Sequence, residues 1–170
     1  SKHPPRIGLI RDYFYELAQE EVKSHTDQIV QRFQNSGAII EEISLPSSFL
    51  ENVLAGEITF KAEAAAYHES NFMSEPNHYP PLIYKIIEEG MKISAIEYTK
   101  AQKIRSEFRR DLQEIFSNFP VLLTPSTPSS APKDLTTTGD KSFQAPWTTA
   151  GVPTINIPSG VDTLGLPLGI

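Results

Sequence analysis

The pattern that most constrains the fold lies in the N-terminal quarter of the sequence, where a strand, a helix and a second strand follow one another. Residues 7–10 (Ile-Gly-Leu-Ile) form a short apolar run bounded by charge, which is typical of a buried strand. Apolar residues recur at helical spacing over residues 17–36, and Gly37 is the expected stop because glycine accepts positive φ. Residues 38–43 are rich in β-branched side chains. This order predicts a βαβ unit with parallel strands, and therefore an α/β fold.

The middle of the chain is predicted to be helical, and two capping boxes mark helix starts. Ser48 with Glu51, and Ser94 with Glu97, have the spacing at which a serine accepts a backbone N–H while the glutamate reaches back. Alanines favour helix, and prolines at 76, 80 and 81 break the pattern. The sequence thus predicts three helices, which are one from Ser48 through residues 61–69, a short one over residues 82–89 and a long one from Ser94 to about Asn118.

The composition changes after the long helix. Residues 121–124 (Val-Leu-Leu-Thr) predict a brief strand, whereas residues 125–142 are rich in proline, serine and threonine and, taken alone, have the composition of a flexible linker. Residues 154–157 (Thr-Ile-Asn-Ile) and 164–170 again carry strand patterns. No internal repeat and no second domain is apparent, so residues 1–170 are expected to belong to one domain.

Charge and composition argue against several classes of function. The 170 residues carry a formal net charge of −6 with both signs interleaved, which disfavours a nucleic-acid backbone as partner. Cysteine is absent, so disulfides, a thiolate nucleophile and sulfur-ligated metal sites are impossible. No stretch resembles a signal peptide or approaches the roughly 20 apolar residues of a membrane span. We expect a soluble, cytoplasmic protein that uses no cofactor and binds neither nucleic acid nor membrane.

Short motifs give no convincing catalytic centre. Ser130 and Lys133 fit the S-x-x-K pattern, but Pro132 lies between them and disfavours the helix that would bring the lysine beneath the hydroxyl. His68 begins like a zinc-protease helix, yet Phe72 stands where the second histidine is needed. These matches are expected to be accidental.

An ordered series of stretches resembles the amidase signature family, which comprises serine-dependent amide hydrolases and the A subunits of glutamyl-tRNA amidotransferases. The stretches are PRIGLIRD (5–12), NSGAIIEEISLP (35–46), FKAEAAAYH (60–68), SAIEYTKAQKIR (94–105), FPVLLTPSTPSSAP (119–132), APWTTAGVPTINIPSG (145–160) and GLPLGI (165–170). Each is weak alone, but together they cover nearly the whole chain. Two positions depart from the family pattern, since Pro120 replaces an aspartate and Thr148 replaces an asparagine.

The resemblance implies a partial amidase signature fold, in which a mixed sheet is flanked by helices and begins with the βαβ unit. Family members use a serine nucleophile, a second serine in a cis peptide and a lysine, and a glycine- and serine-rich segment holds both serines. This sequence has no such segment. The chain therefore resembles the C-terminal portion of an amidase domain, without the catalytic N-terminal half and the final elements, and no catalytic residue is assigned within it.

The resemblance also suggests which residues line a substrate pocket. Trp147 offers an apolar surface, and Thr148 occupies the asparagine position beside it. Gly151 and Pro153 let the backbone pass close to the site. Arg105 lies where the A subunits of amidotransferases carry an arginine that holds a substrate carboxylate. A core tryptophan and a helix-surface arginine are the structural alternatives for Trp147 and Arg105.

Three hypotheses follow for function. The chain is part of an amidase that is inactive alone, a non-catalytic α/β binding module derived from that family, or, least favoured, a hydrolase that uses Ser130 and Lys133. The resemblance places Ile155, Ile157 and Leu168 on strands of one large mixed sheet. An incomplete sheet exposes edges, so we expect self-association through them, and a small amide substrate if the missing half is supplied.

Overall fold

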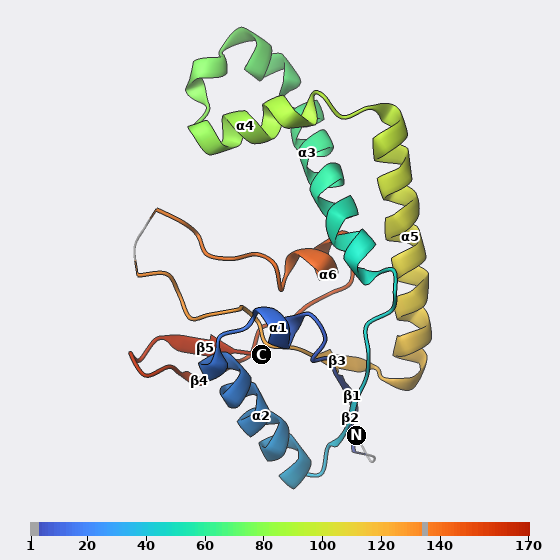
Figure 1. The fold of residues 1–170 in the computed structure, drawn as a ribbon, viewed down its shortest axis with the longest axis vertical. Helices are drawn as coiled ribbons and strands as arrows, with labels where there is room; N and C mark the ends of the chain where they lie inside the picture. The colour runs from blue at the N-terminus through green and yellow to red at the C-terminus, as the bar shows by residue number, and fades with distance from the viewer. Residues whose placement is uncertain (1–3, 134–135) are drawn as a thin grey trace. The chain divides into compact units, whose positions relative to one another are not determined.

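The βαβ unit predicted from the sequence opens the described chain. The structure is a computed structural model that describes residues 4–133 and 136–170 (Figure 1). β1 (Arg6–Leu9), α2 (Glu20–Asn35) and β2 (Ile39–Glu42) follow in order, and the two strands are parallel, with Ile7 paired to Ile40. A one-turn helix that was not predicted, α1 (Phe14–Leu17), precedes α2. The prediction of parallel strands is confirmed.

The end of α2 is set by Gly37. Its φ is 96°, a conformation that glycine adopts without a Cβ penalty. The Gly37 N–H donates to the Gln34 carbonyl (2.9 Å) and the Ala38 N–H donates to the Phe33 carbonyl (3.0 Å). This pair of bonds closes the last turn and directs the chain back into β2, as the sequence predicts.

A third parallel strand completes the first sheet. β3 (Val121–Leu123) pairs with β1 on the side away from β2, which gives the order β2-β1-β3. Helix α2 packs its apolar face on this sheet. The resulting core contains Ile7, Leu9, Ile29, Val30, Leu123 and Ile170.

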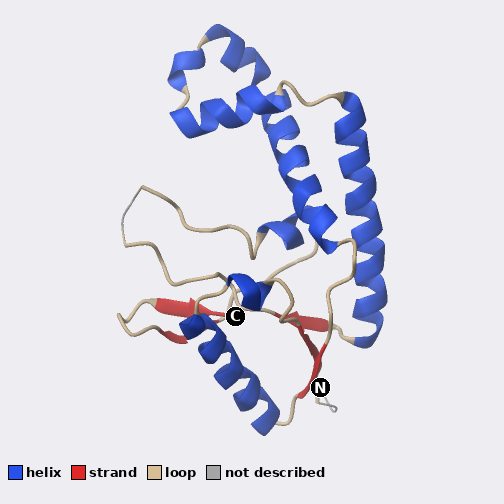
Figure 2. Cartoon of the chain, in the orientation of Figure 1, coloured by secondary structure: helices blue, strands red, loops and turns tan. Residues whose placement is uncertain are grey.

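A two-stranded antiparallel sheet follows near the C-terminus, formed by β4 (Pro158–Val161) and β5 (Pro167–Gly169). The Asp162 carboxylate shapes the turn, since its Oδ1 accepts the N–H groups of Leu164 and Leu166, both at 2.8 Å. A hydrogen bond from the Ser130 side chain, aided by these backbone N–H groups, lowers the pKa of Asp162. The parallel and antiparallel pairs together give the mixed α/β architecture expected from the sequence (Figure 2).

The strand predicted at residues 154–157 is wrong in its position, because β4 begins at Pro158. Ile157 exchanges two backbone hydrogen bonds with Ile170 (2.9 and 3.1 Å), so the β4–β5 ladder reaches one pair further than the strands. Across the described chain, residues 154–156 pair with no strand. A β-prone sequence needs a neighbouring strand to become one, and these residues lack it.

Side chains of α2 hold the antiparallel hairpin. The His25 Nε2 lies 2.7 Å from the Ser159 hydroxyl, and the Thr163 N–H donates to a Glu21 carboxylate oxygen at 2.7 Å. Burial, reinforced by the positive charge of Arg32, lowers the pKa of His25. The hairpin is therefore attached to the helix by contacts that include one titratable group.

The chain divides into two compact units, which we call the sheet unit (residues 1–46 and 111–170) and the helical unit (residues 47–110). The helical unit contains α3 (Phe49–Ser74), the 3₁₀ turn η1 (Pro76–His78), α4 (Pro81–Gly90) and most of α5 (Ala95–Asn118). α3 and α4 meet at Gly90, where an added Cβ would lie 2.0 Å from the Lys61 carbonyl oxygen. The apolar residues beside this contact are Ala65, Phe72 and Ile87.

One of the two predicted capping boxes is confirmed. The Ser94 N–H and hydroxyl both donate to the Glu97 carboxylate (2.8 and 2.7 Å), and the Glu97 N–H donates to the Ser94 hydroxyl at 3.2 Å. The prediction for Ser48 is wrong. Its backbone is already helical (φ −72°, ψ −7°), which is unlike an N-cap, and its side chain makes no capping hydrogen bond.

Candidate functional site

The carboxyl ends of the parallel strands β1 and β3 lie side by side at one edge of the first sheet. β1 has a parallel neighbour on each side, and the chain leaves it first toward β2, then later returns to β3. In α/β sheets, a reversal of this kind leaves a crevice at the carboxyl ends of the strands, where ligands commonly bind. The segments that follow these two ends are residues 10–13 and 124–128.

Tyr13, which follows β1, has an uncommon backbone conformation. Its φ is 64°, and no other non-glycine residue of the described chain has a positive φ. Such outliers concentrate at functional sites, where surrounding contacts hold them. The Tyr13 hydroxyl donates to the Ser142 carbonyl at 3.4 Å, and its ring meets Phe14 edge-on with centroids 5.4 Å apart. Burial and the nearby negative charge of Asp140 raise the pKa of Tyr13.

An aromatic cluster surrounds this turn. Phe14 and Phe143 have no exposed surface and lie edge-to-face at 5.0 Å, while Trp147 stacks on Phe14 at 5.8 Å with an interplanar angle of 4°. Trp147 is only 5% exposed. Most of the Trp147 side chain therefore packs in the core, and only a small part of it reaches the surface.

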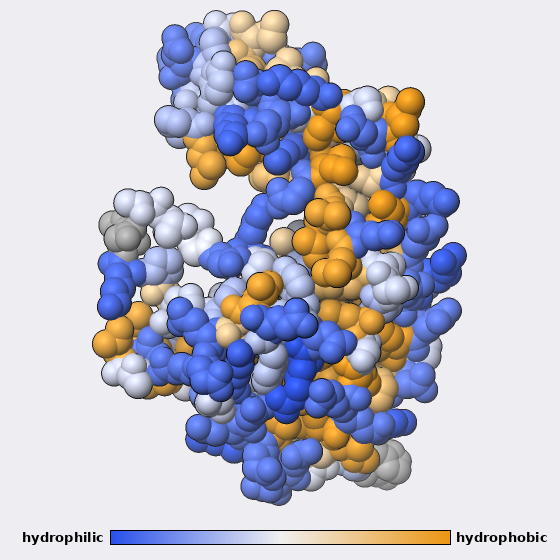
Figure 3. Space-filling model, viewed as in Figure 1, coloured by the Kyte–Doolittle hydropathy of each residue, from blue (hydrophilic) through white to orange (hydrophobic). Residues whose placement is uncertain are grey.

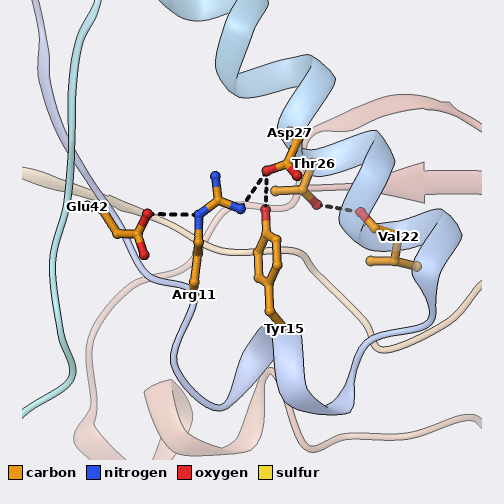
Figure 4. A network of polar contacts seen from close by, with 6 residues as sticks. All are labelled: Arg11, Tyr15, Val22, Thr26, Asp27 and Glu42. Carbon is orange, nitrogen blue, oxygen red and sulfur yellow. Dashed lines mark hydrogen bonds and ion pairs between the residues drawn. The ribbon is translucent and has the colours of Figure 1, made fainter.

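Arg11, directly after β1, organises a polar network (Figure 4). Its Nε donates to Glu42 (3.0 Å), its Nη1 donates to Asp27 (2.6 Å), and its guanidinium lies 4.6 Å from the Tyr15 ring centroid. Burial alone lowers the Arg11 pKa, but the hydrogen bond to Asp27 and neighbouring charges outweigh it, and the net shift is upward. Burial, followed by the Tyr15–Asp27 hydrogen bond, raises the pKa of Tyr15. The network ties α1, α2 and β2 together beside the crevice.

Ser126 is the best-connected residue after β3. Its N–H donates to the Gly169 carbonyl (3.1 Å), its carbonyl accepts from the Gln144 side chain (2.7 Å), and its hydroxyl donates to Asn156 Oδ1 (2.6 Å). Gly169 lies against this pair, and an added Cβ would lie 2.2 Å from Asn156 Oδ1, so a larger residue would displace the Asn156 side chain from its bond with Ser126. Ser126 thus joins three segments that are far apart in sequence.

The flexible-linker interpretation of the proline- and serine-rich segment is wrong for residues 125–130, which bond to other elements, whereas residues 131–133 and 136–141 are exposed. The Gln19 N–H donates to the Pro128 carbonyl (2.8 Å) and the Thr127 hydroxyl donates to the Ser129 carbonyl (2.7 Å). Ser130 hydrogen-bonds Asp162. These contacts anchor the loop, and residues 134–135 of the predicted linker lie outside the described residues. Since the Ser130 side chain bonds a carboxylate, the arrangement gives no support to a Ser130–Lys133 pair.

Two cavities adjoin Ser126. A cavity of about 690 Å³ with mixed polar and apolar walls is lined by residues 126–132 and 137–140, with Asn156, Pro158 and residues 167–169 opposite. An apolar groove of about 760 Å³ is lined by residues 120–124, 152–155 and 157, together with Ile7, Phe33, Phe116, Ser126, Gln144, Trp147 and Ile170. The groove lining contains no charged side chain.

The structure brings only some of the predicted pocket residues together. Trp147 and Pro153 both line the apolar groove. Gly151 ends α6 (Ala145–Ala150) in the left-handed conformation, with φ 71°, and the exposed Thr148 hydroxyl donates to the Gln144 carbonyl at 3.3 Å. Arg105 belongs to the helical unit, where its guanidinium donates to Gln102 at 2.9 Å.

Sequence reasoning missed Tyr13 and the Ser126–Asn156 pair. The sequence around Tyr13 gives no local signal, since two of its contacts, with Ser142 and Phe143, are with residues far along the chain. Among the described residues, no three histidine, aspartate or glutamate side chains converge as a metal site would require. The same part of the chain contains no helix with the length and apolar character of a membrane span.

The fold is α/β, and the residues that follow β3 line two cavities. The sequence model of the Amidase family matches residues 1–170, and the chain belongs to that family. It is 43% identical to the A subunit of the glutamyl-tRNA(Gln) amidotransferase of Rhizorhabdus wittichii, a match over 97% of this chain and 40% of that protein. It is 26% identical to an amidase of Pseudomonas putida, over 95% of this chain and 37% of that protein.

Solved structures of amidases share the fold of this chain. A crystal structure described as that of an amidase superimposes with a TM-score of 0.85 at 25% identity, over 98% of this chain and 41% of the solved one. A bacterial aryl acylamidase shares the fold, with a TM-score of 0.75 at 19% identity. The chain therefore spans about two fifths of the length of these relatives.

Proposed function

We propose that this chain is the C-terminal part of an amidase that hydrolyses carbon–nitrogen bonds, and that its catalytic serines and lysine come from polypeptide outside these 170 residues. The observation that carries the proposal is the Amidase match across the whole chain, combined with the two-fifths share of each relative. The only S-x-x-K candidate supports no alternative, since Ser130 bonds Asp162. The chain alone is then inactive.

In the completed enzyme, the lysine accepts the nucleophile's proton through the second serine, and the serine oxygen attacks the amide carbonyl carbon. The carbon–nitrogen bond breaks, the leaving nitrogen is protonated, and ammonia or an amine departs from an acyl-enzyme. Water then attacks the acyl carbon, releases a carboxylic acid and regenerates the serine. Backbone N–H donors that stabilise the oxyanion contribute about 3–4 kcal/mol each in related chemistry, so a chain without them and without the nucleophile has no turnover.

The part of the site that this chain supplies is a wall. Trp147 and Pro153 line the groove with apolar surface. Between them in the sequence, Thr148 bonds back to the Gln144 carbonyl, and Gly151 ends helix α6 so that the chain can turn toward Pro153. Arg105 is proposed as the group for a substrate carboxylate, because a guanidinium can bind one with two parallel hydrogen bonds.

The test compares the 170-residue chain with the same chain joined to the N-terminal portion of the solved amidase that is 25% identical to it. Ammonia release from a panel of small amides is measured for both. We expect no release from the chain alone and release from the joined protein. Turnover by the chain alone that disappears in Ser130→Ala, but persists in the matched control Ser129→Ala, would contradict the proposal.

A non-catalytic binding module is the second candidate, and the open apolar groove favours it. Its exposed walls also support self-association of the isolated chain, which sedimentation velocity would detect as a concentration-dependent increase in mass. A joined protein that folds, binds partners through the groove and releases no ammonia would favour this candidate.

A further inference from the structure

The β4–β5 hairpin bonds to α2 on one side and to the loop that follows β3 on the other. On the loop side, the Gly169 carbonyl accepts the Ser126 N–H at 3.1 Å. Pro158 and residues 167–169 of the hairpin line the cavity of about 690 Å³. A shift of the hairpin relative to α2 therefore moves one wall of that cavity.

His25 on α2 fits against the backbone of β4. Its Nε2 lies 2.7 Å from the Ser159 hydroxyl, which donates to the Leu168 carbonyl of β5 at 3.3 Å. Gly160 makes room for the ring, since an added Cβ would lie 2.5 Å from its Cε1. The Ser159 hydroxyl carries a single proton and uses it on Leu168, so His25 Nε2 is the donor of the 2.7 Å bond. The hairpin is thus held by the neutral imidazole whose proton is on Nε2.

A second proton on His25 goes to Nδ1, and this atom has no hydrogen-bond partner among the residues that the structure describes. The ring is half-buried, so its charged form loses hydration without gaining an acceptor. Burial, followed by the positive charge of Arg32 about two turns along α2, lowers the pKa of His25. The docked hairpin therefore disfavours the protonated ring.

Two carboxylates lie on the elements that pack against His25. Glu21, about one turn earlier on α2, accepts the Thr163 N–H at 2.7 Å. Asp162, the only charged residue from position 158 to 169, accepts backbone N–H groups of the hairpin turn. Both carboxylates are engaged in backbone hydrogen bonds, and burial with the charge of Arg32 sets the direction of the His25 shift.

We propose that the contact between His25 and the β4–β5 hairpin is a pH-sensitive switch. The neutral ring holds the hairpin on α2, and protonation releases it from α2, while the ladder between β4 and β5 and the Ser126–Gly169 bond remain. Because the folded-state pKa of His25 is lowered from 6.5, the contact is complete above pH 6.5 and is lost as the pH falls through the folded-state pKa. The cavity wall moves with the released hairpin. The inference rests on these contacts and is independent of whether the protein hydrolyses amides.

Nuclear magnetic resonance of the 170-residue chain tests the switch at a single amide. The Thr163 N–H bonds Glu21 only while the hairpin is docked, so its protection from hydrogen exchange reports docking. The Asp162 N–H bonds Leu166 within the hairpin at 2.8 Å and reports the hairpin itself. From about pH 7.5 to about pH 5.5, we expect Thr163 protection, corrected for intrinsic exchange, to fall at least about threefold with the midpoint of the His25 ring titration. Asp162 protection stays unchanged.

Two variants identify the titrating group. His25→Gln keeps a side-chain N–H that can donate to Ser159 but never becomes charged, so it should remove the pH dependence of Thr163 protection. Glu21→Gln, the matched control, keeps an acceptor for the Thr163 N–H and should leave that dependence as in the parent chain. A dependence that persists in His25→Gln, disappears in Glu21→Gln, is absent from the parent chain, or extends equally to Asp162 and the β1 amides would overturn the proposal.

Discussion

The sheet unit and the helical unit each bury a pair of phenylalanines, Phe14 with Phe143 and Phe49 with Phe108, but they expose other apolar side chains in different places. In the sheet unit, Phe14 and Phe143 are fully buried and Trp147 nearly so. In the helical unit, α3 leaves Leu54 67% and Tyr67 83% exposed, and apolar side chains reach the molecular surface (Figure 3). A helix with apolar residues on every face is usually enclosed. Both units therefore have a buried core, and what differs is where apolar side chains stay exposed, along helix α3 in the helical unit and around the apolar groove in the sheet unit.

The largest expected loss in the free energy of unfolding comes from truncating a residue of the aromatic core in the sheet unit. Phe14→Ala removes a ring that contacts both Phe143 and Trp147, and such truncations cost about 3–5 kcal/mol. Chemical unfolding followed by Trp147 emission measures the loss, since the chain has one tryptophan. The control Phe60→Ala, on the 48% exposed Phe60 of α3, is expected to lower the free energy of unfolding by less than Phe14→Ala does, because about half of its surface is already in solvent. Equal losses would remove the contrast between the units.

The contact between α3 and α4 should be the sensitive point of the helical unit. Gly90→Ala places a methyl group against the Lys61 carbonyl, and the helices must separate, at a cost of roughly 1–3 kcal/mol. Hydrogen exchange should become faster in α3 and α4 and remain unchanged in β1. Glu88→Ala, on the same helix, is the matched control and should leave exchange in α3 as it was. Faster exchange across both units would show that they do not unfold separately.

The two capping serines provide a sharper comparison within the helical unit. Ser94→Ala removes a reciprocal cap and should cost about 1 kcal/mol, whereas Ser48→Ala removes no capping hydrogen bond and should cost less. Thermal unfolding of the two variants measures the difference. A larger loss for Ser48→Ala would contradict the assigned helix starts.

The smallest expected effect is the change with pH in the free energy of unfolding of the sheet unit. Because the folded-state pKa of His25 is lowered from 6.5, folding disfavours its protonated form. The His25–Ser159 contact should therefore be fully stabilising above pH 6.5 and weaken as the pH falls through the folded-state pKa. Unfolding measured from pH 7.5 to 5 should show this loss in the parent chain and a smaller slope in His25→Gln. Identical slopes would remove His25 as the cause.

The sequence predicted those elements whose signals are local. α5 was placed within a residue at its start because the Ser94 cap is read from four neighbouring residues, and the end of α2 was placed by Gly37. The start of β4 was misplaced because strand formation depends on a partner that residues 154–156 do not have. The candidate site was predicted only in part. Tyr13 and Ser126 act through residues far along the chain, which spacing alone does not reveal.

The central claim is that the reactive serine lies outside this chain, and a covalent probe tests it directly. A fluorophosphonate, which labels activated serines, is incubated with the 170-residue chain and with the chain joined to the amidase N-terminal portion, and intact mass is measured. The account predicts no adduct on the chain alone and one adduct, within the joined portion, on the completed protein. A stoichiometric adduct on the 170-residue chain alone, at Ser130 or any other serine, would contradict it.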